Sequence, residues 1–303
     1  MNSKRAYAQY FAALLMFGMN GVVASHIAMS SYEIVFTRTL LGSLFTVMLF
    51  VLTQKRVRLF KSKKCALYLF LSGVSMGVSW ILLYEAYRQI GVGVASLAYY
   101  CGPVIVMALS PVLFSEALTR AKVSGFAAVL LGMLLVNLQA LQGGKTAWGL
   151  FCGVMSAVMY AAMVVFNKSV DGITGGENTM WQMLSGFLTL AVFMVFRQGL
   201  ALHIPPGSLL SILVLGLFNT GLGCYFYFSS IGRLPVQTVA VCGYLEPLSA
   251  VLFAALFLDE HLSALQLAGA ALIIGGAAFS EGFHRRGSPM MCRSDEKKRC
   301  DPF

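Results

Sequence analysis

A single carboxylate stands near the middle of a long apolar segment of this chain. Glu246 lies in the stretch VAVCGYLEPLSAVLFAALFLDEHL, residues 239–262, about ten residues from either end of an apolar run at 235–258. At a helical rise of about 1.5 Å per residue, it would lie about 15 Å from each end, near the midplane of a bilayer. An acid there costs about 2.5–3.5 kcal/mol on insertion scales, so it normally faces the bundle interior or a water-filled cavity. We interpret Glu246 as a group that binds a cation, such as a substrate ammonium, or carries a proton. The alternative is a neutral side chain hydrogen-bonded to a neighbouring helix.

An arginine is the second candidate for chemistry. Arg38 lies some five residues into an apolar run at 33–53. The planar donor fork of its guanidinium suits a carboxylate, either that of a solute or that of Glu246. The alternative is a side chain that extends to the membrane surface and leaves its charge in water.

Proline and glycine next to Glu246 predict a bent helix. Pro247 has no N–H to donate and clashes with the carbonyl one turn back, at Gly243, so we expect backbone oxygens left free to face a cavity. Gly243 and Pro247 make the helix easy to bend, and Pro103 is the corresponding residue of the first half of the chain.

Aromatic side chains are candidates for the wall of a substrate cavity. Tyr100 and Tyr244 each stand three residues before a proline, and Trp80 and Tyr84 are one helical turn apart. We expect these four to line the cavity, whereas ordinary packing or an aromatic belt at the membrane surface is the alternative.

Other acids are expected to serve structure. Glu85 and Arg88, three residues apart, share one face of a helix and are predicted to pair. Glu116 and Glu260 each lie in a short turn just before a new helix, which Thr119 can cap in the first case. We expect both acids to shape helix junctions.

The elements that position these residues are apolar helices. The chain is 58% hydrophobic and 11% charged, which excludes an ordinary water-soluble domain. Each predicted span approaches or exceeds the roughly 20 residues that cross hydrocarbon. The ten spans are 6–27, 33–53, 65–88, 92–114, 118–139, 147–168, 178–199, 209–230, 235–258 and 262–283.

The distribution of lysine and arginine predicts the orientation in the membrane. The net charge is +10, and with the N-terminus inside, 18 of the 22 basic residues fall in cytoplasmic segments. Positive charge in short loops marks the cytoplasmic side, so both termini are predicted to be cytoplasmic. This placement explains the charge without a nucleic-acid partner.

The two halves of the chain match at an offset of 144 residues without a gap. Pro103 then falls on Pro247, Gly132 on Gly276 and Gly125 on Gly269. The basic cluster at 55–64 corresponds to GLALHIPPGS at 199–208, which has no lysine or arginine. Five spans per half would invert the second half, and the lost charges agree with that inversion. The predicted fold class is therefore an all-α integral membrane protein with ten transmembrane helices in two inverted five-helix repeats.

These features resemble the EamA-type members of the drug/metabolite transporter superfamily. The resemblance covers about residues 6–283 and rests on the two sets of five spans, Arg38 in FTRTLLGS, and the repeated blocks containing SEAL and DEHL. We place a first EamA-like repeat at 1–143, a second, inverted one at 144–283, and a basic, disordered cytoplasmic tail at 284–303.

The resemblance implies export or exchange of small metabolites, often amino acids, through a central cavity, without covalent chemistry. It also implies a bacterial cytoplasmic membrane. Gly102 stands where the first half would carry the counterpart of Glu246, so any carboxylate role is confined to one repeat.

Three classes of function are candidates for this sequence. A secondary transporter that works by alternating access fits the inverted repeat and the midplane acid, with the bilayer and a small solute as partners and the proton as a candidate coupling ion. An enzyme would need a nucleophile with a base, or a metal cluster, within the bilayer, but all four histidines fall at span edges, in loops or in the tail. We therefore expect no enzyme, cofactor or metal. A non-transporting scaffold or receptor is the remaining alternative, although the sequence shows neither a soluble interaction domain nor a long ordered loop.

Overall fold

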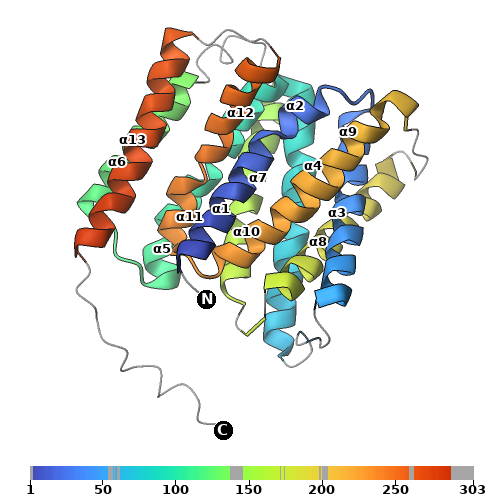
Figure 1. Ribbon diagram of the computed structural model, residues 1–303, viewed down its shortest axis with the longest axis horizontal. Coiled ribbons are helices and arrows are strands. Elements are labelled where there is room, and N and C mark those ends of the chain that lie inside the picture. The colour runs from blue at the N-terminus through green and yellow to red at the C-terminus, as the bar shows by residue number, and fades with distance from the viewer. Residues whose placement is uncertain are drawn as a thin grey trace.

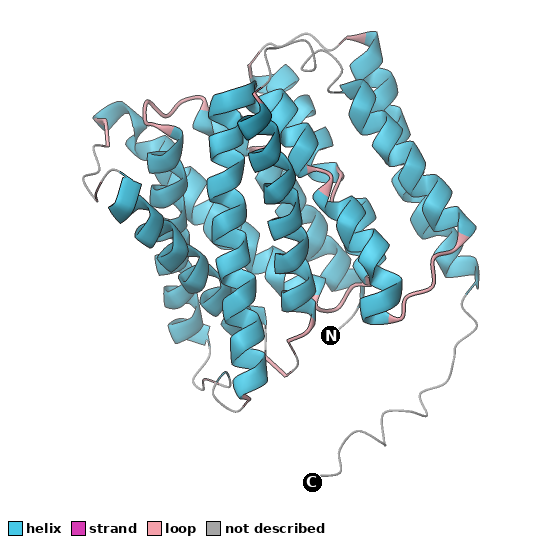
Figure 2. Ribbon diagram, turned by 180° about the vertical axis from the view of Figure 1, so that it is seen from behind, coloured by secondary structure: helices cyan, strands magenta, loops and turns pink. Residues whose placement is uncertain are grey.

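The computed structural model describes residues 3–53, 57, 59, 62–136, 146–170, 172–173, 175–197, 199, 204–258 and 263–287. Within these ranges every regular element is a helix, and short loops join the helices (Figure 2). The α-helices are α1 Ser3–Gly18, α2 Asn20–Ala24, α3 Ser31–Thr53, α4 Lys63–Tyr99, α5 Gly102–Phe114, α6 Arg120–Val136, α7 Ala147–Lys168, α8 Gly175–Arg197, α9 Leu209–Leu213, α10 Gly223–Ile231, α11 Val236–Cys242, α12 Leu245–Phe257 and α13 Ala264–Gly287. A 3₁₀-helix at Pro206–Ser208 precedes α9, and a π-helix at Val214–Leu222 joins α9 to α10. The glutamate predicted at a second helix junction, Glu260, lies outside the described residues.

The helices are long and apolar enough for a membrane. In the described part of the chain, seven helical segments meet this description, and Gly102–Phe114 and Ala264–Phe279 are shorter apolar helices. Large apolar side chains such as Val112 and Phe196, 81% and 86% exposed, lie on the outside of the bundle. Helices whose backbone groups are bonded internally and whose outer faces are apolar are suited to lipid.

Helices from the two halves pack against one another in matching ways. α6 and α13 lie side by side at one edge of the molecule (Figure 1). A Cβ atom on Gly132 would lie 2.6 Å from the carbonyl oxygen of Gly269, and one on Gly276 would lie 2.6 Å from that of Gly125. These glycines are related by the offset of 144 residues, so the contact is reciprocal. Small residues allow such close approach between membrane helices.

Two of the predicted spans are broken near their middles. The span expected at 92–114 starts after a non-helical Gly91 (φ 77°) within α4 and breaks at Tyr100 before α5 begins. The span expected at 235–258 breaks at Gly243 and Tyr244, between α11 and α12. Pro103 and Pro247 therefore lie in the first turns of α5 and α12. A backbone N–H has no acceptor within the helix at such a position, so its loss costs little.

Candidate functional site

A cavity of about 450 Å³ lies within the bundle, between helices of both halves. Five of the residues predicted to bind a substrate line it, namely Arg38, Trp80, Tyr84, Tyr100 and Glu246. The sixth, Tyr244, is 1% exposed and packs behind Tyr100. The cavity extends as far as Gly21, Ala24 and Ser31, around the turn between α2 and α3.

Arg38 is held against aromatic rings at the cavity wall. It lies in the second turn of α3 and is 7% exposed. Its Cζ lies 4.6 Å from the centroid of the Trp80 ring and 5.7 Å from that of Tyr84, both on α4. Its Nε is buried and has no hydrogen-bond partner. A guanidinium stacked on ring faces keeps the N–H groups at its edge available for hydrogen bonds. A buried N–H without an acceptor raises the free energy of the protein, so a bound acceptor would lower it.

Glu246 occupies the first turn of α12 and lines the same cavity. No ion pair joins it to Arg38, although the structure describes both residues. The cavity therefore holds an acidic and a basic side chain that do not neutralise each other directly. The position of Glu246 at a helix start also places it at the positive end of the α12 dipole.

The helix breaks are stabilised by tyrosine hydroxyls. Tyr244 Oη donates to the carbonyl oxygen of Tyr100 at 2.6 Å, which joins the two breaks. Tyr10 Oη donates to the carbonyl oxygen of Val239 at 2.7 Å. The expectation that the Gly243 oxygen would be left free by Pro247 is wrong, because it accepts the N–H of Glu246 at 3.1 Å.

The glycine that replaces glutamate in the first half makes room for an aromatic ring. A Cβ atom on Gly102 would lie 2.6 Å from Cδ1 of Tyr160. Tyr160 lines the cavity, and its hydroxyl lies 3.1 Å from that of Tyr227. The sequence did not single out Tyr160, because a tyrosine inside an apolar run of α7 has no distinguishing pattern. The steric relation to Gly102 becomes visible only in three dimensions.

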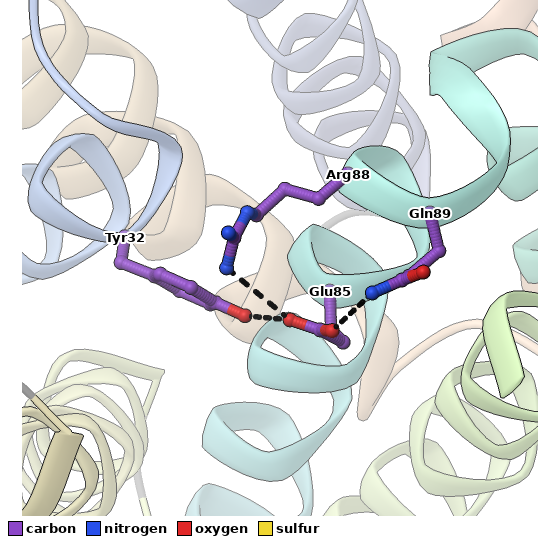
Figure 3. A network of polar contacts seen from close by, with 4 residues as sticks. All are labelled: Tyr32, Glu85, Arg88 and Gln89. Carbon is purple, nitrogen blue, oxygen red and sulfur yellow. Dashed lines mark hydrogen bonds and ion pairs between the residues drawn. The ribbon is translucent and has the colours of Figure 1, made fainter.

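Glu85 belongs to a network of polar contacts with Tyr32, Arg88 and Gln89 (Figure 3). Tyr32 follows Ser31, where the cavity reaches the start of α3. The Glu85 carboxylate accepts the hydroxyl of Tyr32 and, at 3.0 Å, the side-chain amide of Gln89. Arg88 Nη1 lies 3.6 Å from it, so the predicted ion pair is confirmed. This acid is occupied by its neighbours, whereas Glu246 is not.

Glu116 joins the two halves at the other end of the bundle. It follows α5, and its two carboxylate oxygens accept the N–H groups of Val236 at 2.7 Å and Gln237 at 3.1 Å, at the start of α11. Lys168, at the end of α7, donates to the carbonyl oxygen of Ile231 at 3.0 Å. The prediction that Glu116 shapes a helix junction is confirmed, and the junction spans both halves.

These observations define a class: a multi-pass membrane protein with a solute-sized internal cavity that carries separated charges. The sequence profile of the EamA-like transporter family matches residues 4–138 and again residues 147–281. The chain belongs to this family.

Named relatives are transporters and efflux pumps. The chain is 30% identical over 196 residues to a "Probable amino-acid metabolite efflux pump" of Salmonella typhimurium, covering 61% of this chain and 65% of that protein. It is 23% identical over 275 residues to "Uncharacterized transporter YxxF" of Bacillus subtilis, covering 88% and 86% respectively. A solved structure titled "Crystal structure of protein" superposes with a TM-score of 0.79 at 18% identity, covering 91% of this chain and 98% of that one, and shares the fold.

Proposed function

We propose that this chain is a secondary transporter of small, amino-acid-like metabolites that works by alternating access as an exporter or exchanger. The observation that carries the proposal is the cavity with Arg38 and Glu246 on its wall and no ion pair between them. A zwitterion presents one carboxylate and one ammonium, which these two side chains complement. The printed name of the Salmonella relative, an amino-acid metabolite efflux pump, supports the same substrate class.

The proposed topology is ten crossings in two inverted sets of five. In chain order they are α1 with α2, α3, α4 up to Gly91, residues 92–114, α6, α7, α8, residues 206–231, residues 236–257 and α13. Gly132 contacts Gly269, and the residues 144 positions after Gly132 and before Gly269, Gly276 and Gly125, make the same contact. This reciprocity supports a pseudo-two-fold relation between the halves. Two repeats so related can exchange conformations and open alternately to each side of the membrane. We place the protein in a bacterial cytoplasmic membrane with both termini in the cytoplasm.

Counterflow in proteoliposomes tests this function. Purified protein is reconstituted, and uptake of labelled amino acids and related metabolites is measured with and without a pH gradient. Saturable flux is expected for the native protein, with a loss of tenfold or more in Glu246→Gln and Arg38→Ala. Acceleration by the pH gradient, lost in Glu246→Gln, would make the proton the coupling ion.

A matched control separates the site from general damage. Glu33 also lies near the start of a helix, but its carboxylate accepts the N–H of Ser30 within its own turn, and it does not line the cavity. Glu33→Gln should transport normally. Normal flux in both Glu246→Gln and Arg38→Ala would overturn the site. Absence of flux for every solute from folded native protein would favour a scaffold or receptor.

A further inference from the structure

A second hollow lies on the outside of the bundle, away from the central cavity. It is a groove of about 350 Å³ between α4 and α8, with Ala66 and Phe70 on one wall and Trp181, Leu184 and Leu188 on the other. Phe70 and Leu188 are 49% and 55% exposed, so the groove opens to the surroundings of the protein. In a membrane those surroundings are lipid chains.

Close contact between α4 and α8 borders the groove, because Ser185 both lines it and meets Gly73. A Cβ atom on Gly77 of α4 would lie 2.8 Å from the carbonyl oxygen of Gly186 of α8. From Lys63 to Phe70, on the groove wall, is about 10 Å along α4 at 1.5 Å per residue, which lies within one leaflet of a hydrocarbon core of about 30 Å.

An exposed lysine lies one helical turn before Ala66 of the groove wall. Lys63 begins α4 and is exposed, and Lys63, Ala66 and Phe70 follow the spacing i, i+3, i+7 that places residues on one helix face. The neighbouring Lys64 points along another face, with its Nζ 5.7 Å from the ring centroid of Tyr68. No ion pair within the described residues occupies Lys63.

We propose that this groove binds an anionic phospholipid, with the phosphate at Lys63 and one acyl chain between α4 and α8. Apolar walls take the chain, and the ammonium of Lys63 takes the charge. The site is independent of the central cavity and of what that cavity transports.

The second half of the chain explains why the lipid should be anionic and in one leaflet. The residue 144 positions after Lys63 is Gly207, and the segment 199–208 contains no lysine or arginine. The corresponding position at the other end of the bundle therefore offers no cation. Lys63 belongs to the end of the molecule that carries most of the lysines and arginines among the described residues. Because α4 comes from the first half and α8 from the second, the lipid would bridge the two.

Native mass spectrometry of the purified full chain with added phosphatidylglycerol or phosphatidylcholine tests the proposal. Native protein should retain phosphatidylglycerol in preference. Lys63→Gln should lower the affinity for phosphatidylglycerol about fivefold, the effect expected of one cation near a lipid phosphate, and leave phosphatidylcholine unchanged. Lys64→Gln is the matched control, because it removes the same charge from the adjacent residue on another face, and it should have less than a twofold effect.

A second variant tests the acyl-chain part. Ala66→Phe fills the groove and should lower retention of both lipids, with helicity and monodispersity checked in each variant. Equal losses in Lys63→Gln and Lys64→Gln would reduce the effect to general surface attraction and overturn the site. So would equal retention of the two lipids by the native protein.

Discussion

Arg38 owes its position to two aromatic side chains on a neighbouring helix. Trp80 and Tyr84 are one turn apart on α4, so their rings form a surface on which the guanidinium lies. A lysine at this position would keep the charge but would lose the planar fork and most of the stacking. The residue type therefore matters beyond its charge.

Arg38→Lys should raise the KM for a carboxylate-bearing substrate about tenfold, equivalent to about 1.4 kcal/mol, through loss of stacking and of two-point hydrogen bonding. Counterflow at a series of substrate concentrations measures this. Arg197→Lys, at the exposed end of α8, is the control and should leave KM unchanged. An unchanged KM in Arg38→Lys would mean that the guanidinium does not hold the carboxylate.

Some of the residues that line the cavity could be predicted from the sequence and others could not. Arg38 and Glu246 are conspicuous because charged residues are rare inside apolar spans, and both line the cavity. Tyr160 is not conspicuous, and its place on the wall depends on the absence of a side chain at Gly102, 58 residues away in the chain. A close approach of this kind has no local signal in one sequence.

The close packing of α6 against α13 depends on glycine where the two backbones approach each other. Gly275 and Gly276 are adjacent in α13 but face different surroundings. A Cβ atom on Gly276 would lie 2.6 Å from the Gly125 oxygen, whereas one on Gly275 would have nothing within 4 Å. The same chemical change at neighbouring positions should therefore have opposite effects.

Gly276→Ala should destabilise the protein by about 1–3 kcal/mol, because the added methyl group forces α6 and α13 apart. Gly275→Ala should be neutral or stabilise by up to about 1 kcal/mol, because alanine favours the helix. Thermal unfolding in detergent, followed by circular dichroism, compares the two. Equal shifts in Tm would show that the α6–α13 contact is looser than the structure has it.

The sequence predicted apolar helices better than it predicted where each helix begins and ends. Long apolar runs predict membrane-spanning helices because few other structures use them, and seven long apolar helices are present in the described part of the chain. The breaks at Tyr100 and at Gly243–Tyr244 fall inside the predicted apolar runs 92–114 and 235–258. The hydrogen bonds that Tyr244 and Tyr10 donate to the carbonyl oxygens of Tyr100 and Val239 help to hold these breaks together, and they have no signal in the sequence.

The molecule as a whole carries its described lysines and arginines mainly at one end. The proposed ten crossings place that end in the cytoplasm. Alkaline phosphatase fused after residue 197 should therefore be active in a bacterial host, since it would reach the periplasm. A fusion after residue 170 should be inactive. The reverse pattern would invert the topology, and equal activity at both sites would contradict the assigned number of crossings between them.

The pairing of α6 with α13 also sets when α6 can complete its packing during synthesis of the chain. The chain is made from its N-terminus, and the glycine contacts join Gly132 to Gly269 and Gly125 to Gly276, which are 137 and 151 residues apart. At about 5–20 residues per second, the interval between the synthesis of α6 and that of its partner α13 is roughly 7–30 s. During that interval its glycine face is exposed to the lipid and to other nascent helices. α13 is thus the helix that completes the packing of α6, and a chain that stopped short of α13 would leave α6 without this partner.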